Sequence, residues 1–279
     1  MIIYNINKVA PNSKKLMVIR ELFKEGIRVF NRAELEERVA KELGLSYQSF
    51  GVLLHTLVKE GWISTLRKGV YMVEYTATPI YEQEIAMALV TPAMLSHSSA
   101  FRYHNLTDQP LNKVYITTTN TIFVPTEGKE GSKRTAIEIK GISYEFTRIK
   151  PEKFFGGQTG WCGDAKFTVT DLERTLLDGL SQPQYCGGLQ EVVYAYQEYF
   201  NKINLNKIID YAIRLDVAIS RRLGWILDRL IGVRSDQIYS LIQKGSSGYR
   251  LLDPGRDDMG SYDPKWKLRL NHHGSWQQQ

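Results

Sequence analysis

Hydrophobic residues recur at helical spacing in three segments near the amino terminus, residues 12–26, 31–44 and 46–61. Each segment ends at a glycine, which suits the left-handed backbone that closes many helices. The second begins at Asn31 and has Glu34 three residues later, the pattern of a capping box. In the third, the side chains expected to face inward are Phe50, Leu53, Leu54, Leu57 and Val58. Three consecutive helices are therefore predicted.

Two short β-prone runs follow, residues 62–65 and 70–73, joined by Leu66-Arg67-Lys68-Gly69. This linker reads as a hairpin turn with glycine at the position that needs a positive φ. Three helices and a hairpin are the element order of a winged helix-turn-helix, in which the third helix can enter a major groove and the hairpin can reach phosphates. The candidate DNA contacts are Tyr47, Gln48, His55 and Lys59 on the helix, with Arg67 and Lys68 on the hairpin.

Residues 76–79 look like a boundary because Pro79 cannot continue a central strand. Beyond it the patterns predict strands at 114–119, 135–140 and 142–147. They also predict helices at 82–90, 95–104, 170–180, 189–200, 205–215 and 217–231. Asn105 is expected to end the second of these as a left-handed cap, and residues 170–173 form a capping box at the start of the third. The expected class is α+β, with a winged helix in residues 1–76, a larger mixed domain in 77–271 and a polar tail in 272–279.

Composition limits the classes of function. Apolar residues make up 43% and charged residues 24% of the 279, as in ordinary globular proteins. There is no apolar run of about 20 residues and no signal-peptide pattern, so we expect a cytoplasmic protein without membrane contact. The net charge is +6, and residues 1–75 hold 12 Lys or Arg against 8 Glu and no Asp, hence +4. The basic excess is concentrated where the sequence predicts DNA binding, which it permits without requiring.

The sequence contains no complete catalytic motif. There is no phosphate-binding glycine loop, HExxH or GxSxG pattern, and no cofactor or metal is expected. The pair Glu138 and Lys140 has the spacing found in metal-dependent nucleases, but Asp108, the nearest preceding aspartate, lies in a turn context. His97 and His104 lack a third ligand. A solvated strand face and structural histidines explain these residues more simply than an active site.

A second basic feature lies in the carboxy-terminal half. Lys207, Arg214 and Arg221 recur every seven residues and would form a cationic stripe if this stretch were helical. Such a stripe could contact DNA or an acidic partner. The alternative, which we favour, is a solvated face paired with Asp210, Asp216 and Asp228.

The chain resembles the AbiEi antitoxins of bacterial abortive-infection toxin-antitoxin systems. The resemblance rests on the order of five segments, LRKGVY, PAMLSHSSAFRYHNL, FTVTDLERTLLDGLSQPQYCGG, YAIRLDVAISRRLGWILDRLIG and KWKLRLN. It implies an autorepressor whose winged helix binds inverted repeats in the promoter of its own operon. It also implies a non-catalytic larger domain that opposes a co-encoded nucleotidyltransferase-like toxin without a stable complex. Ser98, Ser99, Asp178 and Arg222 lie in these segments, and we interpret them as caps, packing and helix-face charges.

Two alternatives from other classes remain open at this stage. One is a metal-dependent nuclease that uses Glu138 and Lys140. The other is a winged-helix module that binds only a protein partner. Salt dependence separates the latter from DNA binding, because phosphate-dominated affinity falls steeply with ionic strength.

Overall fold

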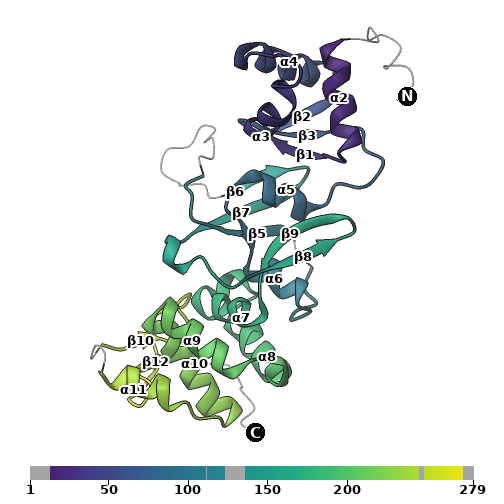
Figure 1. The fold of residues 1–279 in the computed structure, drawn as a ribbon. Coiled ribbons are helices and arrows are strands. Elements are labelled where there is room, and N and C mark those ends of the chain that lie inside the picture. The colour runs from purple at the N-terminus through teal and green to yellow at the C-terminus, as the bar shows by residue number, and fades with distance from the viewer. Residues whose placement is uncertain (1–12, 111, 123–135, 245–247, 273–279) are drawn as a thin grey trace. The chain divides into compact units, whose positions relative to one another are not determined.

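The computed structural model describes residues 13–110, 112–122, 136–244 and 248–272 (Figure 1). The chain divides into two compact units. Unit 1 comprises residues 1–91 and 161–166, and unit 2 comprises residues 92–160 and 167–279. Helices and three sheets are present in the described residues, which confirms the predicted α+β class.

Unit 1 contains helices and one small sheet. The helical elements are α2 (Lys14–Lys24), α3 (Arg32–Leu35), the π-helical turn η1 (Glu36–Ala40), α4 (Tyr47–Lys59) and α5 (Glu82–Leu89). The sheet has the order β1-β3-β2, with β1 (Val29–Asn31), β2 (Ile63–Arg67) and β3 (Val70–Val73) all antiparallel. Buried apolar side chains of α2, α4 and the hairpin, such as Leu22, Phe50 and Ile63, form one core. The strand β1 was not predicted from the sequence.

Glycine caps in unit 1 were predicted correctly. Gly26 and Gly61 have φ values of 64° and 76° and follow the ends of α2 and α4. The residue after each glycine donates its N–H to a carbonyl five residues earlier. Ile27 N donates to Leu22 O at 2.8 Å, and Trp62 N donates to Leu57 O at 3.0 Å. These bonds satisfy carbonyls that the helix end leaves free.

The β2–β3 hairpin differs from its prediction in one respect. Strand β2 extends through Arg67, which pairs with Val70, so only Lys68 and Gly69 form the turn. Gly69 has a φ of 80°, as expected for a two-residue turn. Arg67 was predicted to lie in the turn itself; the structure places it in the strand, where a bulge between Thr65 and Arg67 shifts the register.

Unit 2 is built around a mixed sheet of order β6-β7-β5-β4-β9-β8. Strands β5 and β7 run parallel, whereas β6–β7 and β4–β5 are antiparallel. The bounds are β4 (Met94–Leu95), β5 (Lys113–Thr118), β6 (Ala136–Ile139), β7 (Ile142–Arg148), β8 (Gly157–Cys162) and β9 (Ala165–Thr170). Strands β5, β6 and β7 were predicted, although residue 135 of the second predicted strand lies outside the described residues.

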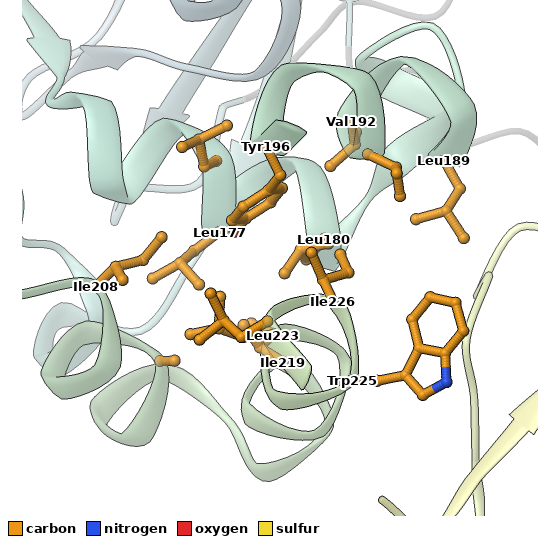
Figure 2. Close-up of a cluster of buried hydrophobic side chains, with 14 of the residues drawn as sticks. Leu177, Leu180, Leu189, Val192, Tyr196, Ile208, Ile219, Leu223, Trp225 and Ile226 are labelled. Atoms are coloured by element: carbon orange, nitrogen blue, oxygen red, sulfur yellow. The ribbon is translucent and has the colours of Figure 1, made fainter. Parts of the chain in front are cut away.

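The helices of unit 2 form its largest core. They are α6 (His97–Tyr103), α7 (Leu172–Ser181), α8 (Leu189–Tyr199), α9 (Leu205–Leu215), α10 (Val217–Ile226) with the π-helical turn η5 (Leu227–Ile231), and α11 (Asp236–Lys244). Short 3₁₀ turns are η2 (Pro151–Lys153), η3 (Pro183–Tyr185) and η4 (Phe200–Lys202). Figure 2 shows α7, α8, α9 and α10 converging through side chains that include Leu177, Tyr196, Ile208, Leu223 and Ile226.

A third, small sheet of order β10-β12-β11 closes the described chain, with β10 (Arg250–Leu251), β11 (Ser261–Asp263) and β12 (Leu268–Leu270). This sheet and α11 were not predicted. Three local predictions were also wrong. Leu95 lies in β4 rather than in a helix, Lys140 lies in the β6–β7 turn with a φ of 50°, and Asp171 rather than Thr170 caps α7 by accepting from Arg174 N.

Candidate nucleic-acid interface

Helix α4 has one buried face and one exposed face. It begins after Ser46, whose hydroxyl accepts from Ser49 N at 3.2 Å, as a capping side chain does. Phe50, Leu54 and Leu57 are buried, while Leu53 and Val58 are only partly buried. The four candidate contacts on the helix, Tyr47, Gln48, His55 and Lys59, are all exposed. The structure therefore leaves them accessible on one element, as the sequence predicted.

Sequence reasoning missed Arg32, which supports the start of α4. Its guanidinium lies 3.9 Å from the centroid of the Tyr47 ring, and its Nη2 donates to Tyr47 O at 2.8 Å. A Cβ on Gly51 would lie 3.2 Å from the same nitrogen, so the glycine leaves room for this arrangement. Glycine inside an otherwise regular helix was the available signal, because it often marks the close approach of another group.

The two hairpin cations have different environments. Lys68 is exposed at the turn. Arg67 is half-buried and its Nε donates to Leu89 O at 2.7 Å, and burial lowers the pKa of its guanidinium from the ordinary value. Lys68 is therefore the hairpin cation that is free to meet a phosphate, whereas Arg67 already fixes the strand to the end of α5.

The three cations of the carboxy-terminal half do not form a stripe. Lys207 and Arg214 lie on α9 and Arg221 on α10, and Asp216 between these two helices caps α10 by accepting from Ala218 N at 2.7 Å. Lys207 Nζ lies 2.8 Å from Glu173 and 3.2 Å from Asp171, and these carboxylates outweigh burial to raise its pKa. Arg221 is fully buried and donates to backbone carbonyls, so the prediction that it contacts a partner at the surface is wrong.

Arg214 has a third environment. Its guanidinium is stacked 3.8 Å from the centroid of Phe155 and is still exposed. Of the three predicted contacts in this half of the chain, Arg214 is thus the one that presents an accessible charge without a carboxylate partner among the described residues.

The candidate nuclease residues are not assembled into a metal site in the described part of the chain. Glu138 is exposed on β6, and Lys140 lies in the following turn rather than on the strand. Within the described residues, no three His, Cys, Asp or Glu side chains are grouped so that they could hold a metal ion. Among the described residues, the fold therefore adds no carboxylate that would complete a metal site with Glu138, Lys140 and Asp108.

These features define a class: a mixed α+β protein with a basic amino-terminal segment that carries a helix with an exposed polar face and a hairpin with a cationic tip. Residues 17–73 match the family described as "Transcriptional regulator, AbiEi antitoxin". The match lies within unit 1 and confirms the resemblance over these residues. Residues 17–73 are therefore similar to this family of regulators.

Nearly the whole chain is similar in fold to a solved structure. This is the crystal structure of the RV2827C protein from Mycobacterium tuberculosis, with a TM-score of 0.57 at 13% sequence identity. The similarity covers 91% of this chain and 90% of that one. At this identity it is evidence of a shared fold alone. Among curated proteins, no significant match was found. None of the helices in the described residues is long and apolar enough to cross a membrane.

Proposed function

We propose that the protein is a DNA-binding autorepressor in which α2 to β3 act as a winged helix-turn-helix. Helix α4 would enter the major groove with Gln48 and His55 toward base edges, and Lys59 and Lys68 would contact phosphates. Arg32 would hold Tyr47 at the start of the helix. The observation that carries the proposal is the exposed polar face of α4 in the segment that matches the AbiEi regulators.

The remaining assignments follow the family. Residues 1–76 would bind inverted repeats in the promoter of the protein's own operon, and residues 77–271 would provide antitoxicity. The functional partner would be a co-encoded nucleotidyltransferase-like toxin, opposed in the cytoplasm without a stable complex and without catalysis by this chain. We assign no role to residues 272–279, most of which lie outside the described residues.

Two substitutions test the docking model. Lys68→Ala should weaken binding to all DNA sequences alike and reduce the slope of log affinity against log salt by roughly one, because one phosphate contact is lost. Gln48→Ala should change the preference among sequences, at a cost of about 1–3 kcal/mol on the preferred site. Competition mobility-shift assays measure both effects. Lys202→Ala, an exposed cation in unit 2, is the control.

An outcome in which neither Lys68→Ala nor Gln48→Ala alters DNA binding would reject the docking model. A protein that binds no DNA but retains antitoxicity in cells would instead favour the protein-interaction module. That alternative uses the same exposed face of α4, on which Tyr47 and Val52 are 66% and 69% exposed. The nuclease alternative predicts metal-dependent cleavage that Glu138→Ala abolishes.

A further inference from the structure

Unit 2 contains a cavity of about 200 Å³ between the sheet and the helices α7 and α10. Its walls include Thr117 and Thr147 from β5 and β7, Asp178 from α7 and Arg222 from α10. The cavity is smaller than the roughly 300–1,000 Å³ of sites for drug-sized ligands, so it suits a small metabolite. Its polar and charged lining distinguishes it from a packing defect, which would be apolar.

Arg222 contributes a buried positive charge. Its side chain is 7% exposed, and it donates from Nε to Leu251 O and from Nη1 to Leu180 O, both at 3.0 Å. In the described chain no carboxylate lies within ion-pair distance of it. Burial lowers its pKa to about 10, which still leaves the guanidinium charged at neutral pH. The charges of Asp216 and Asp253 act on it without an ion pair, and a buried cation that lacks a directly bonded anion is costly unless a ligand supplies one.

Asp178 contributes an unused acceptor. Its Oδ1 accepts from Arg174 Nε at 2.8 Å, but its Oδ2 is buried without a hydrogen-bond partner, and the side chain is only 8% exposed. Arg174 Nη1 donates elsewhere, to Lys153 O and Phe155 O. Leaving a buried acceptor unsatisfied is unfavourable, so a ligand that donates a hydrogen bond to this oxygen would be stabilised.

Hydrogen bonds connect the side chains of the cavity wall near these groups. His97, at the start of α6, has both ring nitrogens engaged, Nδ1 with Ser96 Oγ at 2.9 Å and Nε2 with Gln182 Oε1 at 3.0 Å. The Ser96 hydroxyl also accepts from Thr117 Oγ1 at 2.8 Å. A wall fixed in this way preserves the positions of the charged groups that a ligand would meet.

We propose that this cavity binds a small organic anion that also carries hydroxyl or amino donors. The anionic group would meet Arg222, with Lys153 assisting, and a donor would bond to Asp178 Oδ2. The lining holds three cations, Lys153, Arg174 and Arg222, against Asp178 and Asp216, a formal excess of +1. A water molecule could donate a hydrogen bond to Asp178 Oδ2, but it could not neutralise the charge of Arg222. An anionic ligand could do both.

The anion could be a carboxylate or a phosphate, and calorimetric titration of the full chain separates the two. The probes are L-serine, D-ribose 5-phosphate, inorganic phosphate and D-ribose. We expect L-serine or D-ribose 5-phosphate to bind at least tenfold more tightly than inorganic phosphate and D-ribose, because only the first two combine an anion with donors.

Variants locate the binding. Arg222→Gln and Lys153→Gln should each weaken it, the first by tenfold or more, while Lys202→Gln should leave it unchanged. Lys153 is only partly buried, so its variant keeps the test valid if Arg222→Gln fails to fold. The proposal is overturned if none of the four probes binds at millimolar concentration, or if inorganic phosphate or D-ribose binds as tightly as both bifunctional probes. Binding that is unaffected by Lys153→Gln and by a folded Arg222→Gln would also overturn it. The test is independent of DNA binding.

Discussion

His97 is a buried histidine with a backbone φ of 50°, a left-handed conformation that is uncommon outside glycine. Its ring packs against Tyr115 and Tyr185. Burial has the largest effect on its pKa and lowers it, and the charge of Arg174 lowers it further. The charge of Asp178 and the hydrogen bond to Gln182 raise the pKa, but the net shift is downward. The folded protein thus holds this imidazole in its neutral form.

The lowered pKa predicts a loss of stability in mild acid. At pH values above about 6.5 the histidine is neutral in both the folded and unfolded states. As pH falls below that value the unfolded state binds the proton first, so the free energy of unfolding decreases until the folded pKa is reached, by about 1.4 kcal/mol for each unit between the two pKa values. Urea unfolding at pH 7.5, 6.5 and 5.5 measures this.

Two variants make the test specific. His97→Gln should flatten the profile between pH 6.5 and 5.5, whereas His55→Gln, which removes an exposed histidine from α4, should follow the wild type. Parallel profiles for His97→Gln and the wild type would show that another group causes the pH dependence.

At the residue scale, the sequence indicated which residues carry charge but not what each charge meets. Lys68 and Lys59 are exposed, as predicted, because turns and polar helix faces meet solvent. Arg67 and Arg221 looked equivalent to them, yet both donate to carbonyls brought from elsewhere in the chain, Leu89 and Gly248. Such partners are set by tertiary packing, which local pattern does not report.

At the element scale, helix α10 is packed closely against Trp266. A Cβ on Gly224 would lie 2.1 Å from Trp266 Cζ3, and the indole is 1% exposed and donates from Nε1 to Asp228 at 3.0 Å. The ring is therefore held in place and cannot move aside easily. This contact joins the helical core of unit 2 to the chain between β11 and β12.

Gly224→Ala should destabilise the protein. Overpacking of a core costs about 1–3 kcal/mol, partly offset by the better helix propensity of alanine. Gly248→Ala is the matched control, because nothing lies within 4 Å of its Cβ position, and it should change stability by no more than about 0.5 kcal/mol. Equal urea midpoints for Gly224→Ala and the wild type would refute the packing argument.

Elements with strong local signals were predicted well. Helix α9 has the predicted bounds. Asn105, with a φ of 58°, follows the end of α6 as expected, and the next residue, Leu106, donates its N–H to Phe101 O at 2.8 Å.

Strand β8 was not predicted because it contains two glycines, Gly157 and Gly160, and glycine is disfavoured in strands. A Cβ on Gly157 would clash with the side chain of Met94, and a Cβ on Gly160 would clash with the ring of Phe167, so the glycines leave space for these side chains.

At the scale of the whole molecule, Arg28 connects distant segments of unit 1. Its side chain is 8% exposed and forms ion pairs with Glu84 at 3.0 Å and Asp164 at 2.8 Å, and it donates to Thr78 at 2.7 Å. Burial alone would lower its pKa, but the bonds to Asp164 and Glu84 raise it. No sequence pattern linked Arg28 to residues 50 to 136 positions away, because such pairings depend on the completed fold.

Arg28→Met should loosen unit 1 locally. Removing hydrogen bonds to charged groups costs about 1.5–3 kcal/mol. Hydrogen exchange measured by mass spectrometry should therefore become faster in α2 and α5, with α8 in unit 2 unchanged. Arg20→Met, which removes an exposed cation from α2, is the control and should leave all three helices unchanged. Unaltered exchange in Arg28→Met would show that the network does not stabilise unit 1.

The central claim is that unit 1 binds DNA from the protein's own promoter. The most direct measurement is the anisotropy of a labelled duplex from immediately upstream of the gene, titrated with the full chain at 50 and 200 mM salt against a scrambled duplex. If unit 1 binds promoter DNA, the promoter duplex binds more tightly than the scrambled one. Its affinity also falls steeply with salt, and the slope of log affinity against log salt steepens by about 0.9 for each phosphate contact. Equal affinity for both duplexes, or affinity that is insensitive to salt, would contradict the central claim.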